Sequence, residues 1–164
     1  MPENEGMDFC NDTFRRVLGN FATGVTVVTG IMPDGRAVGM TVSAFTSVSM
    51  DPPLVSVCFA KSGQSLDAFV KGTHFTVNVL SDRQKEQSQH FARRAEDKFD
   101  GIDYRIGENG CPILPGSLAA VQCAREGVHD TGDHWLIIGR VEALDAAQSG
   151  EPLIHFRGDY RHLA

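Results

Sequence analysis

Short apolar runs rich in β-branched residues recur along this chain, and none is followed by a helix long enough for the crossover that parallel strands require. Residues 25–29 and 54–60 are examples, and the second run is almost continuously apolar, as in a strand buried on both faces. Further strands are expected over residues 37–41, 45–49, 75–80, 118–125 and 135–144. This rhythm predicts a single, mainly β domain over residues 1–164, a closed antiparallel barrel with peripheral helices. A doubly wound sheet is the weaker alternative.

The expected helices are short. One near the N-terminus ends at Gly24 and has apolar residues at i, i+3, i+4 and i+7, namely Phe14, Val17, Leu18 and Phe21. A second is expected over residues 65–70. A capping-box pattern from Ser81 to Gln84 opens a third helix that runs to about Phe91. The first helix and the long apolar strands present more apolar surface than one small barrel covers, which predicts a homodimer.

Charge and the N-terminal residues limit the possible functions. The formal net charge of −6 argues against a nucleic-acid-binding protein, because such proteins carry clustered Lys and Arg. Residues 1–10 are acidic and polar, unlike a secretory signal, and no apolar run approaches the roughly 18 residues of a membrane helix. The cysteines lack disulfide or zinc-site spacing, and Cys58 and Cys123 lie in apolar runs, as buried thiols do. The chain is therefore expected to be cytoplasmic and to bind neither nucleic acid nor a membrane.

Common catalytic motifs are absent from the sequence. It has no GxGxxG, GxxxxGK[ST], GxSxG or HExxH pattern, so neither a Rossmann nor a P-loop turn holds a nucleotide. A cluster of possible metal ligands lies at His129, Asp130, Asp133 and His134. Because Gly132 interrupts it, the cluster fits neither helix nor strand spacing for converging ligands, and a solvated turn is favoured.

A hydroxyl-rich stretch, residues 41–49, is more suggestive. Hydroxyl groups beside free backbone N–H groups can hold a phosphate and the polar edge of a ring without a fixed cation. They are provided here by Thr41, Ser43, Thr46, Ser47 and Ser49. Ser and Thr are also common on half-exposed strands, and the residues alone favour this plainer interpretation.

The longer motifs resemble a known family. Residues 21–29 (FATGVTVVT) and 39–55 (GMTVSAFTSVSMDPPLV), with a downstream Gly-Asp-His at 132–134, are similar to the short-chain flavin reductases. These are the reductase components of two-component, flavin-dependent monooxygenases. The resemblance covers residues 9–160 and implies a dimeric, FMN-binding split β-barrel with peripheral helices and the flavin in a groove near the subunit interface.

The resemblance also implies roles for individual residues. The isoalloxazine edge would be lined by Thr41, Val42, Ser43 and Ala44, with Ser47 and Ser49 toward the ribityl chain and phosphate. The phosphate pocket would be completed by Ala60, Lys61, Ser62 and Ser65. In this pocket Lys61 would supply the charge, and Ser65, at a helix start, would add backbone N–H donors. The flavin would be bordered from the loop side by Phe91 and Lys98.

His134 is the expected catalytic residue and would face the nicotinamide, with Arg157 and Tyr160 as further candidates. No metal is implied. Hydride would pass from NADH or NADPH to FMN or FAD, while the protein orients two stacked rings. NADH is favoured because no obvious Arg pair marks a 2′-phosphate site. Reduced flavin would then leave for a partner monooxygenase.

Two other functions remain open. The first is a non-catalytic FMN-binding protein of the same barrel, used for electron transfer or flavin storage. The second is a nucleic-acid-binding barrel of the OB type, which the charge of −6 and the lack of a basic, aromatic strand face disfavour.

Overall fold

The computed structural model describes residues 9–163, so residues 1–8 and Ala164 of the expected domain lie outside the described part. The helices are α1 (Asn11–Leu18), α2 (Asp67–Val70) and α3 (Lys85–Ala92), with a 3-10 turn η1 (Asp82–Gln84) before α3. The first half of the chain forms β1 (Thr23–Gly24), β2 (Thr26–Ile31), β3 (Ala37–Val42), β4 (Phe45–Met50), β5 (Pro53–Ala60) and β6 (His74–Val79). The second half forms β7 (Arg105–Ile106), β8 (Pro112–Ile113), β9 (Ala119–Thr131), β10 (His134–Ala146), β11 (Ile154–Phe156) and β12 (Asp159–Arg161).

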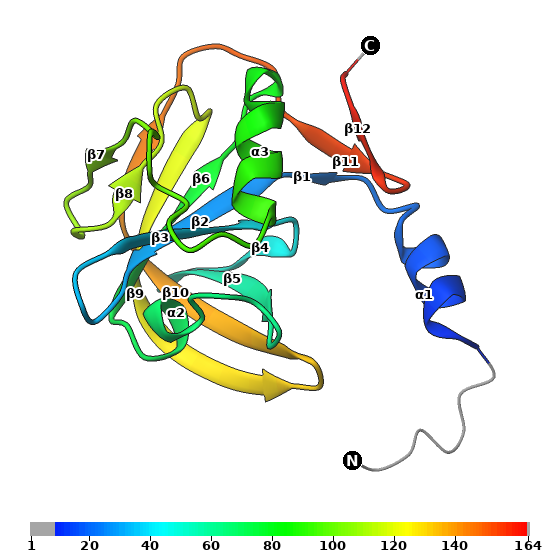
Figure 1. The fold of residues 1–164 in the computed structure, drawn as a ribbon, viewed down its shortest axis with the longest axis horizontal. Coiled ribbons are helices and arrows are strands. Elements are labelled where there is room, and N and C mark those ends of the chain that lie inside the picture. The colour runs from blue at the N-terminus through cyan, green and yellow to red at the C-terminus, as the bar shows by residue number, and fades with distance from the viewer. Residues whose placement is uncertain (1–8, 164) are drawn as a thin grey trace.

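One antiparallel sheet of seven strands, in the order β3-β2-β6-β9-β10-β5-β4, makes the body of the molecule (Figure 1). Its two edge strands, β3 and β4, are consecutive in the chain and joined only by Ser43 and Ala44, yet they share no ladder. The closed barrel expected from the strand rhythm is therefore wrong, and the split barrel implied by the resemblance is confirmed. Helix α3 packs against β3, where the Thr41 hydroxyl donates to the Ser88 carbonyl at 2.6 Å.

The core consists of two clusters. The larger one lies inside the curled sheet, where Phe59 and Phe69 stack with their ring centroids 4.5 Å apart. The smaller one lies between the sheet and α3 and contains Val27, Leu80 and Phe91. A row of buried polar groups on β2 and β6 then fixes the segment that carries β7 and β8. The Thr29 hydroxyl donates to the Pro112 carbonyl, and the Asn78 side chain accepts from the backbone N–H of Leu114.

Most expected strands are confirmed within one or two residues, but two elements differ. Strand β9 continues to Thr131, well beyond residue 125, because β10 pairs with it along the whole of a long hairpin. Helix α1 ends at Leu18 rather than at Gly24, which lies in β1. The Asn20 amide stops the helix by donating to the carbonyls of Arg16 and Val17 at 2.9 and 3.1 Å.

Helix α1 stands apart from the barrel, beside the small sheet of β1, β11 and β12 (Figure 1). None of its residues is buried, and its apolar side chains are among the exposed ones. By contrast, the third helix begins with the expected capping box, formed by Ser81 and Gln84. Among the described residues, no helix is both long and apolar enough to span a lipid bilayer.

The cysteines are free thiols, as expected. Burial raises the pKa of Cys111 to about 11 and, as the largest of three causes, the pKa of Cys123 to about 12. Both thiols therefore stay protonated at neutral pH and act as small apolar core groups.

Candidate active site

The split in the barrel exposes the hydroxyl-rich stretch. Strands β3 and β4 each have one edge without a ladder partner in this sheet, so backbone donors and acceptors are accessible on both sides of the Ser43–Ala44 link. Ser43, Ala44 and Ser47 are exposed, whereas Val42 is buried. Since the Thr41 hydroxyl is bound to α3 and the Thr46 hydroxyl to the Ser47 carbonyl, the hydroxyl groups of Ser43, Ser47 and Ser49 are left to meet a ligand.

The turn after β5 lies against the same edge. Any Cβ at Gly63 would come within 2.5 Å of the Met40 methyl group, so β3 and this turn touch. Ser65 has a φ of +64°, a left-handed conformation that is uncommon for serine and often marks a functional turn. Its expected place at a helix start is wrong, because α2 begins only at Asp67. A helix of one turn also has little dipole to offer an anion.

The loop after α3 completes the third side. The Arg94 guanidinium donates to the Ser62 carbonyl at 3.0 Å, and the Ala95 backbone N–H donates to the Gln64 side chain at 3.1 Å. Three segments that are distant in sequence, residues 39–44, 60–65 and 91–98, therefore meet at the split.

Phe91 and Lys98, which the resemblance expects to border the flavin, have side chains that face inward. Phe91 is 1% exposed and packs under Gly39. The Lys98 ammonium donates to the carbonyls of Phe91 and Gly39 at 2.8 and 3.3 Å, and burial lowers its pKa. Both residues thus fix the loop to β3, and the structure shows no face of Phe91 open to a ligand.

His134 begins β10 and lies directly opposite Ala60 of β5 in the sheet. It follows a tight turn whose Gly132 has a φ of +68°, and the Thr131 hydroxyl donates to the His134 carbonyl at 3.1 Å. His134 Nδ1 donates to Asp133 Oδ1 at 2.7 Å. The pKa of the Asp133 carboxyl is lowered, mainly by this hydrogen bond and secondly by the positive charge of His134. The imidazole is therefore held in one orientation at the barrel rim.

Lys61 is tied to the same rim. Its backbone N–H donates to the Asp133 carbonyl at 2.9 Å, and its ammonium pairs with Asp130 at 2.5 Å, lying 4.9 Å from the centre of the Trp135 ring. Sequence reasoning missed this role of Asp130, which gave no signal because it is 69 residues from Lys61. Among residues 9–163, no group of three or more His, Cys, Asp or Glu side chains is arranged to hold a metal ion.

Arg157 and Tyr160 form their hydrogen bonds with residues other than His134. The Tyr160 hydroxyl is 2.7 Å from the Ser88 hydroxyl, and its ring packs against the core under α3. Arg157 lies in the turn between β11 and β12, where it contacts the end of α1 through Asn20. Tyr160 therefore anchors the C-terminal hairpin to α3 through Ser88, and Arg157 joins the same hairpin to the end of α1 through Asn20.

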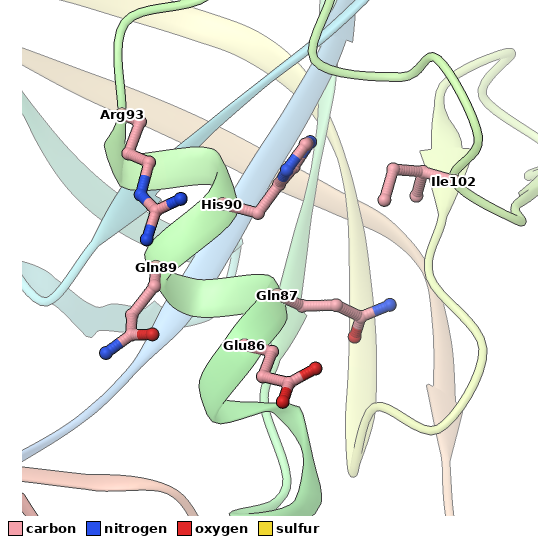
Figure 2. A pocket seen from close by; sticks show the side chains of 6 residues that line it. All are labelled: Glu86, Gln87, Gln89, His90, Arg93 and Ile102. Atoms are coloured by element: carbon pink, nitrogen blue, oxygen red, sulfur yellow. The ribbon is translucent and has the colours of Figure 1, made fainter.

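A separate hollow of about 420 Å³ lies on the outer side of α3 (Figure 2). His90 and Gln87 point toward Ile102 there, while Arg93 and Gln89 point away. His90 Nε2 is within hydrogen-bond distance of the Lys98 carbonyl, at 2.7 Å, so this side of α3 also helps to hold the loop. Of the residues that line the hollow, only Arg93 belongs to one of the three segments at the split.

The rim at the split suits a flat, polar, phosphate-bearing ring. Within the described residues, the hydroxyl groups of Ser43, Ser47 and Ser62 have no intramolecular hydrogen-bond partner, and they lie beside the accessible edges of β3 and β4. The flavin isoalloxazine needs donors along its pyrimidine edge, and its side chain needs donors for a phosphate. These exposed donors are compatible with the flavin site that the sequence resemblance implies.

Comparison with known proteins supports the resemblance to flavin reductases. The profile of the flavin reductase-like domain matches residues 18–164. The chain is 45% identical over 147 residues to the reductase subunit of a flavin-dependent monooxygenase of Rhodococcus jostii, covering 90% of this chain and 75% of that one. It is 46% identical over 149 residues to an FMN reductase (NADH) of Agrobacterium fabrum, covering 90% and 83%.

Among solved structures, nitrilotriacetate monooxygenase component B of Mycobacterium thermoresistibile superimposes with a TM-score of 0.88 at 41% identity, covering 93% of this chain and 86% of that one. The chain therefore belongs to the flavin reductase-like family. It is a flavin reductase, an NAD(P)H:flavin oxidoreductase.

Proposed function

We propose that this flavin reductase uses NADH to reduce free FMN or FAD at the split of the barrel and releases the reduced flavin to a partner monooxygenase. The observation that carries the proposal is the meeting of three segments, residues 39–44, 60–65 and 91–98, beside His134. The relatives support the finer points: one is named an FMN reductase (NADH), and others are named reductase subunits of monooxygenases.

The residues at the split would divide the flavin between them. Ser43, Ala44 and the free edges of β3 and β4 would meet the isoalloxazine, and Ser47 and Ser49 would lie toward the ribityl chain. Ser62 and Lys61 would meet the phosphate, with Ala60 and Ser65 shaping the turn. When bound, the flavin supplies the hydride acceptor, so the protein needs neither a nucleophile nor a metal.

His134 would position the nicotinamide. Asp133 fixes the imidazole through Nδ1. The His134 side chain is 43% exposed, so the other edge of the ring is accessible to an incoming amide or phosphate. The proposed role is to hold the two rings within reach for hydride transfer, for which reacting atoms must approach to about 3–3.5 Å. No proton transfer is required of it.

Exchange of flavin and a dimeric state complete the proposal. The rim residues Ser43, Ser47 and Ser62 are exposed, which suits a flavin that leaves after reduction. We also propose that a second copy of the chain covers the apolar face of α1, none of whose residues is buried in the single chain.

Steady-state NADH oxidation with FMN, FAD and riboflavin, each in excess over enzyme, tests the proposal. We expect many turnovers per protein and weak flavin retention on gel filtration. Flavin retained at one per chain without NADH oxidation would instead identify a flavin-storage or electron-transfer protein. A chain that binds single-stranded DNA and no flavin would revive the nucleic-acid-binding alternative.

His134→Ala tests the positioning role. Because it removes one hydrogen bond, worth about 0.5–1.5 kcal/mol, KM for NADH should rise roughly three- to tenfold and hydride transfer should slow, with flavin Kd unchanged. Stopped-flow transfer rates and flavin fluorescence quenching measure the two effects separately. His129→Ala, an exposed histidine on the same hairpin, is the matched control. Weakened flavin binding with normal hydride transfer would contradict the role.

A further inference from the structure

A basic hollow lies outside the rim, between the end of α1 and the turn that joins β11 to β12. It has a volume of about 600 Å³ and is lined by Arg15, Arg16, Gly19, Asn20, Arg157 and Gly158. Half of these residues are arginines and none is acidic, although the chain carries a net charge of −6. Since like charges repel, three guanidinium groups around one hollow favour an anion between them. We call Arg15, Arg16 and Arg157 the basic corner.

Arg157 is held in place for this purpose. Its φ is +51°, a left-handed conformation that costs free energy for a residue other than glycine. Its backbone N–H donates to the Gly19 carbonyl at 2.9 Å, and its Nε donates to Asn20 at 2.8 Å. Its guanidinium also lies 5.0 Å from the centre of the Phe156 ring. These contacts use Nε and leave both Nη groups, which make the paired hydrogen bonds that guanidinium forms with phosphate.

The two arginines of α1 are free to join it. Arg15 has only a distant and exposed partner, Asp12 at 3.8 Å. Arg16 lies on the side of α1 opposite the apolar face of Phe14, Val17 and Leu18, whereas Arg15 lies at the border of that face and lines a hollow together with Phe14. A dimer contact through the apolar face therefore leaves Arg16 accessible.

Arg15 connects the basic corner to the candidate active site. It also lines a second hollow, of about 570 Å³, together with Phe9, Asn11, Phe14, Asp133 and His134. The positive charge of Arg15 also acts on Asp133, adding to the larger effect of His134 in lowering the pKa of that carboxyl. One side chain thus borders both the imidazole and the basic hollow.

We infer that the basic corner binds the diphosphate of the nicotinamide dinucleotide whose nicotinamide faces His134. This inference rests on the proposed function and moves Arg157 from the nicotinamide end of the ligand to its diphosphate. A diphosphate carries two negative charges and several acceptor oxygens, which match the unused Nη groups. The flavin phosphate is a poorer match, because Lys61 and Ser62 serve it on the other segment of the rim.

Calorimetric titration of the full-length protein with ADP-ribose, which has the diphosphate but no nicotinamide, tests the inference. Wild-type protein should bind ADP-ribose and should not bind adenosine. Arg16→Gln and Arg157→Asn should each weaken ADP-ribose about tenfold, the loss expected for one charged hydrogen bond. Asparagine tolerates the left-handed conformation, so the second variant keeps the turn. The salt dependence of ADP-ribose binding should become shallower in both variants.

Three controls separate the alternatives. Arg161→Gln, in the same hairpin but paired with Asp159, should bind ADP-ribose as the wild type does. His134→Ala should also keep ADP-ribose binding, and the arginine variants should keep their flavin Kd. The inference is overturned if the arginine variants bind ADP-ribose normally, or if they lose flavin instead. Absence of both ADP-ribose binding and NADH oxidation in the wild type would overturn the proposed function itself.

Discussion

In the proposed site, Lys61 would be a ligand group and a structural group at once. Its ammonium has three donors, and one of them is directed at Asp130. Its side chain is 34% exposed, so the remaining donors reach the rim. A carboxylate so close reduces the positive charge available to a flavin phosphate. In the proposed site the pair would therefore keep the affinity for phosphate at a moderate level, which suits a flavin that leaves after reduction.

This arrangement predicts opposite effects from the two partners. Lys61→Ala should weaken FMN about tenfold, because a charged hydrogen bond is lost, and should leave riboflavin nearly unaffected. Asp130→Asn should tighten FMN severalfold, since the lysine keeps a hydrogen-bond acceptor but is no longer neutralised. Fluorescence quenching with FMN and with riboflavin measures both variants. Lys71→Ala, which breaks an exposed pair with Asp67, is the control. An equal loss of FMN and riboflavin would make Lys61 a residue of the fold alone.

At the level of elements, α3 packs closely against the face of β3 beside the split. Gly39 is the residue that permits it, because a Cβ there would lie 2.7 Å from the Phe91 ring. The Phe91 ring in turn packs among Leu80, Leu114 and Leu153. Helix α3 and strand β3 can therefore approach each other here because β3 has a glycine, Gly39, where α3 has the large side chain of Phe91.

Gly39→Ala should lower the free energy of unfolding by about 1–3 kcal/mol, the usual cost of overpacking. Phe91→Leu alone should also destabilise, but the double variant should lose less than the sum of the two, since the smaller side chain makes room for the added methyl group. Urea unfolding of the four proteins gives the coupling. Gly24→Ala, which meets nothing within 4 Å, should change stability by less than about 0.5 kcal/mol. Strictly additive losses would show that Gly39 and Phe91 do not share one space.

The sequence predicted elements well where the local pattern was strong. The β-branched runs became β2 and β5, and the capping box at Ser81 became the start of the third helix. The end of α1 was misplaced because Asn20 stops it through side-chain bonds that no periodicity reveals. The open barrel was also invisible in the strand rhythm, because strand periodicity does not show which edges pair. The contact of α3 with β3 was invisible too, since the residues of the Thr41–Ser88 bond are 47 apart in the chain.

For the whole molecule, the main exposed apolar surface is the face of α1. Phe14, Val17 and Leu18 are 52%, 56% and 53% exposed, and Phe21 is 77% exposed, which is unusual for adjacent large apolar side chains. The helix is attached to the body chiefly through β1 and the β11–β12 hairpin. A second copy of the chain, which would form the proposed homodimer, is the simplest partner for such a face.

Val17→Glu should therefore yield a monomer whose barrel is intact, because no residue of α1 belongs to the core. Light scattering at micromolar concentration should show a dimer for the wild type and half that mass for the variant. When the wild type is diluted until it is also monomeric, the two proteins should have similar Tm values. Glu86→Lys, on the exposed side of α3, is a charge-changing control that should stay dimeric. A wild-type monomer with full activity would refute the dimer.

The site was partly predictable for the same reason as the fold. The hydroxyl-rich stretch and the Gly-Asp-His turn are local, and the structure does bring His134 opposite Ala60. The roles of Lys98, Tyr160 and Arg157 depend on which distant carbonyl, hydroxyl or amide each one meets. Those partners, Gly39, Ser88 and Asn20, are determined by the tertiary fold and not by neighbours in the chain.

The order of strands in the large sheet also bears on how the chain is made. The centre of the sheet is the β9–β10 hairpin, which begins only at Ala119, while the strands before it form two separate ladders, β3-β2-β6 and β5-β4. A nascent chain on the ribosome therefore carries two half-sheets, with β6 and β5 unpaired along the edges that the hairpin will occupy. Long-range pairing of this kind is slow, and open edges invite association with other chains. Synthesis of the last third of the protein is thus the step that ends its exposure to aggregation.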